Sequence, residues 1–310
     1  MPAGQAPGQA RQPDHETIGL TMKSSIIITL SLIASLAHAD DAFHHHRFKT
    51  GEMIQYDYED SDTVFAAVLQ DGTIQAGDAI KVQEIKIPVG IKVQSQGKGL
   101  VRKLTILPLS QYRASPLDSL AQTPFESLTK LIKNLQPSFA YSYKDDTDAL
   151  NNLQKTFESI RKDKVGGFLF FKIQDIHQML ESTEHIPEGI TPGQTHSSPR
   201  NERKGLGGKF IVAPGQLIYH GTEIFDGIRS GYFKVISLGH QFSLPEMKTY
   251  TNFFFTMHVA LEGPDQGLLL FGEGQETATV LKGTDKGNYQ PQALLQRQFS
   301  IRLHRPQTDR

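Results

Sequence analysis

The strongest alternation of apolar and polar residues in the chain lies within residues 250–271. Successive side chains of a strand point to opposite faces of a sheet, so this alternation predicts one apolar and one polar face. The apolar face comprises Phe253, Phe255, Met257, Val259 and Leu261, and the polar face comprises Asn252, Thr256 and His258. Residues 262–267 (EGPDQG) are turn-rich and precede the apolar residues 268–271. The pattern predicts an antiparallel hairpin at the centre of a β core.

Phe254 breaks this alternation because it lies on the face opposite Phe253 and Phe255. Either both faces of the strand are covered there, or one face lines a ligand cavity. The candidate ligand-binding residues are therefore Phe253, Phe254, Phe255, Met257 and His258.

The same two-residue period recurs in the first third of the chain. Residues 54–58 and 85–93 alternate, and the apolar stretch 64–69 precedes Asp71-Gly72, a strong signal for a two-residue hairpin turn. Pro88 cannot donate a backbone hydrogen bond, so we expect it in an edge strand or at a bulge. Residues 53–112 are therefore predicted to be a β region.

The middle of the chain has a helical period instead. Residues 123–126 (TPFE) resemble a capped helix start, and apolar residues then recur at helical spacing until Pro137. A second helix is predicted from the acidic residues 145–148 to the basic end before Gly166-Gly167, and a third from 173 to 184. A short apolar strand, 168–171, is expected between them.

These patterns predict an α+β fold: an antiparallel β-rich sandwich or open barrel, with a central two- to three-helix segment packed on it. Proline and glycine recur between residues 186 and 208, which indicates a linker or a mobile functional loop. The predicted regions are a disordered leader or misassigned start (1–21), a signal peptide (22–39), a flexible His-rich tail (40–52), a β region (53–112), a helical segment (115–185), a loop (186–208) and an antiparallel β region (209–304).

Residues 22–39 (MKSSIIITLSLIASLAHA) contain a basic residue, a short apolar run and a small-x-small site in order. This order is typical of a signal peptide, with cleavage expected before Asp40. The apolar run is shorter than the roughly 20 residues that a membrane helix needs, and no other run approaches that length. We therefore expect an exported protein of the bacterial envelope, periplasmic or secreted, without an integral membrane segment after cleavage.

Charge and cysteine content narrow the chemistry. The 32 Lys and Arg residues nearly balance the 33 Asp and Glu residues, so no overall field favours nucleic acid. The chain has no Cys, which excludes disulfides, thiolate nucleophiles and Cys-ligated zinc. No cofactor is expected.

Two groups of residues could bind a metal ion, with zinc as the alternative to no cofactor. His44, His45 and His46 follow two aspartates, although nothing in an extended tail would orient their rings. On the third predicted helix, His177, Glu181, Glu184 and His185 share one stripe. The zincin spacing H-E-x-x-H is absent, and a solvated polar face explains the stripe equally well.

No nucleophile elbow and no complete dinucleotide fingerprint occurs in the chain. The leading hypothesis is therefore an exported envelope protein without catalytic activity. It would bind an apolar or amphipathic ligand, or an envelope protein as partner, through its β structure. One alternative is a secreted hydrolase, with or without a metal ion, that uses His177, Glu181 and His185 together with a histidine from a strand. The other is a structural envelope protein without a small-molecule ligand.

Overall fold

The computed structural model describes residues 41–96, 99–106, 111–114, 138–142, 172, 175–177, 179–180, 182–205, 208–244, 246–283 and 288–305. All of them belong to the compact unit Ala39–Arg310. The predicted leader, signal peptide and first two helices lie outside the described residues, as do the predicted strand 168–171 and Glu181.

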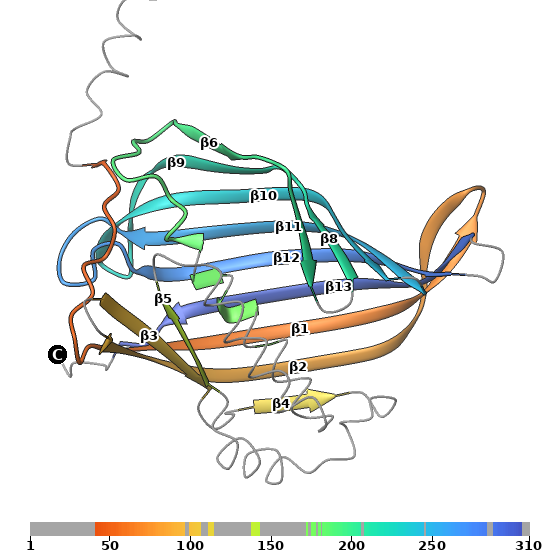
Figure 1. Ribbon diagram of the computed structural model, residues 1–310, viewed down its shortest axis with the longest axis horizontal. Coiled ribbons are helices and arrows are strands. Elements are labelled where there is room, and N and C mark those ends of the chain that lie inside the picture. Colours follow the sequence, from red (N-terminus) through yellow and green to blue (C-terminus); the bar gives the residue numbers. More distant parts are fainter. Residues whose placement is uncertain are drawn as a thin grey trace, which may run out of the picture. The chain divides into compact units, whose positions relative to one another are not determined.

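The described strands form one thirteen-stranded sheet in which every pairing is antiparallel (Figure 1). They are β1 (Met53–Gln70), β2 (Thr73–Gln96), β3 (Gly99–Ile106), β4 (Gln111–Ala114), β5 (Ser138–Ser142), β6 (Thr195–Ser198), β7 (Asn201–Gly205), β8 (Gly208–Val212), β9 (Gly215–Phe225), β10 (Ile228–Leu244), β11 (Met247–Ala260), β12 (Leu269–Gly283) and β13 (Tyr289–Leu303). Their order is β5-β3-β2-β1-β13-β12-β11-β10-β8-β7; β4 pairs with β2, and β9 pairs with β10 and β6.

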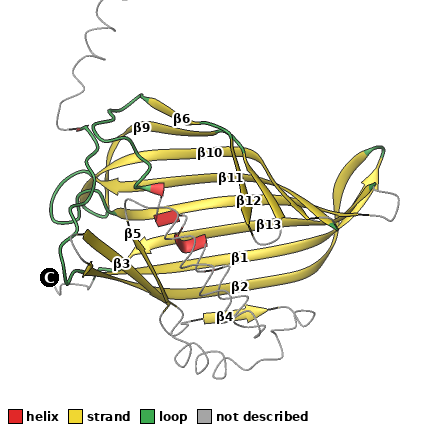
Figure 2. Ribbon diagram, in the orientation of Figure 1, coloured by secondary structure: helices red, strands yellow, loops and turns green. Residues whose placement is uncertain are grey.

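The α+β prediction is wrong, because the described structure is nearly all antiparallel sheet (Figure 2). Among the described residues, α-helix is confined to residues 172, 175–177, 179–180 and 182, and no described helix reaches seven residues. Within the predicted helical segment, Ser138–Ser142 is strand β5 and pairs with β3. Its sequence, SFAYS, contains two aromatic residues that favour strands, but the pairing partner is remote in sequence and leaves no local signal.

The first and last thirds of the chain join at β1, which pairs with β2 on one side and with β13 on the other. Side chains of these strands alternate between two faces. The inner face carries buried residues such as Tyr58, Ile87, Phe255 and Ile301. The outer face carries their sequence neighbours, among them Asp57, Lys86 and Ser300.

The two hairpins expected from the sequence are confirmed. Asp71 and Gly72 join β1 to β2 as a two-residue loop with positive φ angles of 51° and 77°. Such a loop matches the twist of the paired strands, and Asp-Gly is a favourable pair for it. The hairpin expected within residues 250–271 is formed by β11 and β12, in which His258 lies opposite Phe271.

Pro88 lies where β2 changes partner among the described strands. Gln83–Lys86 pairs with β4 and Val89–Gln96 pairs with β3, while β1 pairs with β2 along its opposite side. The prolyl ring, which has no N–H to donate, is thus accommodated between the two neighbouring strands rather than at a bulge.

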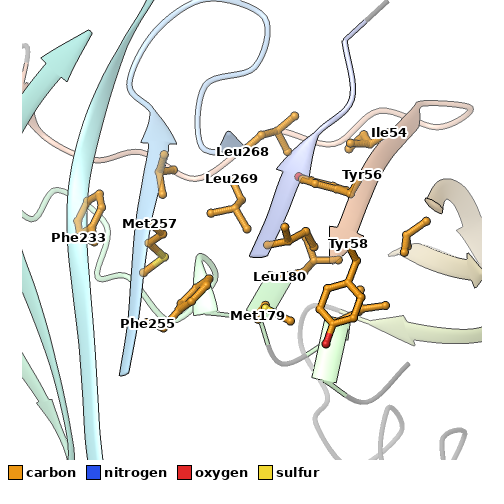
Figure 3. Packing of buried hydrophobic residues seen from close by; sticks show 14 of the residues in the cluster. Ile54, Tyr56, Tyr58, Met179, Leu180, Phe233, Phe255, Met257, Leu268 and Leu269 are labelled. Carbon is orange, nitrogen blue, oxygen red and sulfur yellow. The ribbon is translucent and has the colours of Figure 1, made fainter. Parts of the chain in front are cut away.

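The apolar inner face is covered by other parts of the same chain. Figure 3 shows Met179 and Leu180 of the helical residues close to Tyr58 of β1. Ile176, Ile186 and Ile190 belong to the same core cluster. The inner face is therefore covered in this region by side chains from within the predicted helical segment and loop.

Residues 41–48, which we call the N-terminal strap, contribute a further anchor. Phe43 is 0% exposed and packs edge-on against Phe233, with ring centroids 5.9 Å apart. Its backbone exchanges hydrogen bonds with Gly189 and Ile190 at 2.8 and 2.9 Å. The sequence predicts a solvated flexible tail here, whereas this phenylalanine is part of the core.

Glycine permits the aromatic packing on the inner face of β12. A Cβ at Gly274 would lie 2.5 Å from the Phe299 ring and 2.5 Å from the backbone oxygen of Phe254. Because this position has no side chain, the rings of Phe255 and Phe299 approach each other across β12, with centroids 6.0 Å apart. Residues of β11 and β13 therefore pack as one layer.

Candidate functional site

A groove of about 610 Å³ crosses the outer face of six strands. Two neighbouring cross-strand rows line it. The first row, set by the register, runs through Lys86, Glu59, Ser300, Glu273, Thr256 and Lys234. The second runs through Glu84, Ser61, Gln298, Gln275 and Phe254. The side chains of these two rows thus come from alternate positions of the strands, and the intervening Asp60, Ile85, Gly274 and Phe299 also border the groove.

Phe254 is the exposed aromatic residue of this lining. This residue is 41% exposed, although both sequence neighbours point to the inner face. Around it stand amide, hydroxyl and charged groups. Lys86 Nζ bonds Glu59 Oε1 at 2.6 Å, so these two charges compensate each other. The groove thus combines one apolar platform with many hydrogen-bonding groups.

The next row of the outer face, outside the groove, is aromatic. It runs through Arg302, Phe271, His258 and Tyr232. The His258 ring stacks on Phe225 at 4.3 Å, and its Nδ1 lies 2.9 Å from Glu223 Oε1. Burial lowers the pKa of His258, although nearby carboxylates including Glu223 oppose this. The arrangement favours a neutral imidazole that packs as an aromatic ring.

The structure separates the five ligand-binding candidates of the sequence. Phe255 and Met257 are completely buried in the core. Phe253 is partly buried on the same inner face and stacks on Phe299, with centroids 5.7 Å apart. His258 lies in the aromatic row. Phe254 alone among the five lines the groove.

A second polar site, which the sequence-based reasoning missed, lies on the inner face. Its members are charged or hydroxyl-bearing residues from three strands and the helical residues: Tyr58, Asp60 and Asp62 of β1, Glu276 of β12, Arg297 of β13, and Lys172 and Asp175. We call this set the inner charged cluster.

Arg297 and Lys172 hold the cluster together. Arg297 donates to Asp60 Oδ2 at 2.6 Å, to Asp175 Oδ2 at 2.7 Å and to Glu276 Oε2 at 3.2 Å. Lys172 Nζ donates to Asp60 Oδ2 at 2.6 Å and to Asp62 Oδ2 at 2.9 Å. The cluster links the helical residues to the inner face of the sheet.

The environment moves the pKa values of the two β1 aspartates in opposite directions. Burial would raise the pKa of Asp60, but the Arg297 and Lys172 charges outweigh it and lower this pKa. Burial raises the pKa of Asp62 to about 6 against the effect of Lys172, and the negative charge of Asp60 adds to this rise. Burial also raises the pKa of Glu276.

A signal for this cluster exists in the sequence. The inward positions Ile54, Tyr56 and Tyr58 continue at the same two-residue period to Asp60 and Asp62. Carboxylates on an otherwise buried face require partners, which only the remote segments supply.

The metal candidates do not converge in the described structure. His44 Nδ1 bonds Glu188 Oε1 at 2.7 Å, whereas His46 Nε2 bonds Glu52 Oε1 at 2.8 Å. His45 donates its backbone N–H to Glu188 at 3.0 Å. No group of three or more His, Asp or Glu residues among those described is arranged to hold a metal ion.

The helical stripe is also divided. His177 is helical, while Glu184 and His185 lie in the turn that follows, and Glu184 forms an ion pair with Arg102 of β3. Glu181 lies outside the described residues. The described members of the stripe therefore do not form one ligand set.

No protein-family model and no curated protein sequence matches the chain. Among solved structures, an outer membrane channel of Pseudomonas putida F1 is similar at a TM-score of 0.20 with 8% identity, covering 84% of this chain and 98% of that one. The outer-membrane expressed OmpT of Vibrio cholerae has a TM-score of 0.14 with 7% identity, covering 84% and 100%. At these TM-scores the similarity does not establish a shared fold. None of the described helical stretches is long and apolar enough to cross a membrane.

Proposed function

We propose that this protein is an exported envelope protein that binds an amphipathic ligand in the outer-face groove without catalysis. The observation that carries the proposal is the position of Phe254, half-exposed among the polar rows of a groove of about 610 Å³. Ligand pockets commonly have volumes of about 300–1,000 Å³ and combine an apolar contact with a few polar groups. The signal-peptide motif in residues 22–39 supports export.

The covering of the inner face favours the outer site. An apolar ligand inside would compete with Phe43, Ile176, Met179 and Leu180 for the same apolar surface. The cavity near the strap and Leu180 has a volume of only about 30 Å³. These side chains already shield the apolar inner face from water, so a ligand there would have to displace them.

The lining of the groove indicates the chemistry of the ligand. On the outer-face rows, Glu59, Glu84 and Glu273 face Lys86 and Lys234, so the charges nearly balance. Serine, threonine and glutamine side chains supply both hydrogen-bond donors and hydrogen-bond acceptors. An uncharged polar group such as a sugar therefore fits the rows, and an attached alkyl chain would cover Phe254.

Titration of the mature chain, residues 40–310, with an alkyl glycoside below its micelle concentration tests this proposal. We expect saturable binding by calorimetry, and at least about tenfold weaker binding for Phe254→Ala, since a buried Phe contributes about 1.5–3 kcal/mol. Leu238→Ala is the matched control, because Leu238 is 52% exposed on the same face but does not line the groove.

The corresponding methyl glycoside separates the two parts of the ligand. It should bind more weakly than the alkyl glycoside and respond little to Phe254→Ala. Equal binding of the alkyl glycoside by the wild-type protein and the Phe254→Ala variant would refute the assigned role of this residue. Absence of saturable binding would refute the proposed ligand class.

A further inference from the structure

The inner charged cluster contains more acids than bases. Four carboxyl groups, those of Asp60, Asp62, Asp175 and Glu276, face two cations, Lys172 and Arg297. The neighbouring Tyr58 hydroxyl donates to Asp60 Oδ2 at 2.5 Å, and Gln83 lies opposite Asp62 on β2. Counted over the described residues, full ionisation would leave an excess of two negative charges in a site largely removed from water, which is costly.

Two oxygen atoms of the cluster indicate where a proton would be held. Asp60 Oδ1 and Asp62 Oδ1 are both buried, and neither accepts a hydrogen bond from a described residue. Arg297 Nε lies 3.3 Å from Asp62 Oδ1 as an ion-pair contact. Asp60 and Asp62 occupy alternate positions on one face of β1, and both contact the same Lys172 ammonium, at 2.6 and 2.9 Å. One proton between them would provide the missing donor and remove one excess charge.

We propose that Asp60 and Asp62 form a site for one shared proton, and that binding of this proton strengthens the attachment of the described helical residues (172, 175–177, 179–180 and 182) to the inner face. In the protonated state Asp62 donates an O–H bond to Asp60. Asp60 stays ionised and keeps its contacts with Lys172 and Arg297.

Proton linkage determines the direction of the effect. The pKa of Asp62 is raised to about 6 by burial and by the Asp60 charge, whereas undocking of the helical residues would hydrate this carboxyl and lower its pKa. The docked state therefore binds the proton more tightly. Docking is favoured as the pH falls through about 6, and this contribution is lost as the pH rises through the same value.

Hydrogen exchange of the mature chain, followed by mass spectrometry between pH 5 and 8, measures this attachment. After correction for the intrinsic pH dependence of exchange, amides of the helical residues should be about tenfold more protected at pH 5 than at pH 8 if Asp62 regains an ordinary pKa on undocking. Asp62→Asn mimics the neutral carboxyl and should remove most of this pH dependence, leaving a smaller part from Glu276, whose pKa burial also raises. Glu276→Gln should retain most of it, and the outer-face control Asp57→Asn should retain all of it.

Three outcomes would overturn the proposal: equal protection of the wild-type protein at pH 5 and 8, a wild-type pH dependence in Asp62→Asn, or loss of the dependence in Glu276→Gln instead. Should Asp62→Asn fail to fold, carbon-13 NMR of the wild-type protein with labelled aspartate provides an independent test. A carboxyl carbon that titrates near pH 6 supports the shared proton. Aspartates that all titrate below pH 5 contradict it.

Discussion

The inner and outer faces of this sheet are made by alternate residues of the same strands, yet one face is buried and the other is in contact with solvent. On β11, Phe255 is buried in the core, while the adjacent Phe254 stands half-exposed in the groove. On β1, Tyr58 is buried and its neighbours Asp57 and Glu59 are exposed. The comparison shows that residue type alone does not determine whether a side chain is buried or exposed here. The two-residue period of the strand and the chain segments that cover one face determine it.

Charged residues show the same contrast. On the outer face, Lys86 and Glu59 form an ion pair in contact with water. On the inner face, Lys172 and Arg297 pair with carboxylates that are largely shielded from solvent. Water screens the first pair, whereas removing one member of the second set leaves buried charges without a partner.

The largest effect is expected from Arg297→Ala. The substitution leaves Asp60, Asp175 and Glu276 without their shared cation, and breaking a buried ion pair costs about 3–5 kcal/mol. Urea denaturation should show this loss in the free energy of unfolding at pH 7. Arg302→Ala on the outer face is the matched control and should cost less than about 1 kcal/mol. Similar losses for both variants would remove the distinction between the faces.

A second comparison uses two phenylalanines. Phe43→Ala should lower the free energy of unfolding by about 3 kcal/mol, because Phe43 of the strap is completely buried against the inner face. Phe254→Ala should change it by less than about 0.5–1 kcal/mol, since its side chain is 41% exposed. Thermal unfolding of both variants measures the difference. A negligible effect of Phe43→Ala would show that the strap contributes little to the core.

The smallest effect is expected from Lys86→Ala. Its ion pair with Glu59 lies on the exposed face and should contribute no more than about 0.5 kcal/mol. Urea denaturation at low and high salt should show that this small difference shrinks further, because salt screens exposed charges. A loss of several kcal/mol that persists at high salt would mean that the outer face is not solvated as the structure indicates.

Several local features could be predicted from the sequence. The alternation of residues 250–271 correctly predicted the β11–β12 hairpin and the direction of Phe254, and Asp71-Gly72 correctly predicted the β1–β2 turn. These features depend on neighbours in sequence: a two-residue period determines the face of a strand, and a loop with positive φ needs particular residues. The groove was not predicted, because its rows combine residues from β1, β2, β10, β11, β12 and β13.

By itself, the sequence determined which stretches alternate, where tight turns occur, and that no cysteine chemistry is available. Only the tertiary structure decided that β1 joins β2 to β13, that Phe43 is a core residue, and that Asp60 and Asp62 share Lys172. The physical reason is distance along the chain. Lys172 and Asp60 are 112 residues apart, and Arg297 and Asp60 are 237 residues apart. The need of a buried carboxylate for a partner can be recognised locally, but the partner itself is chosen by the fold.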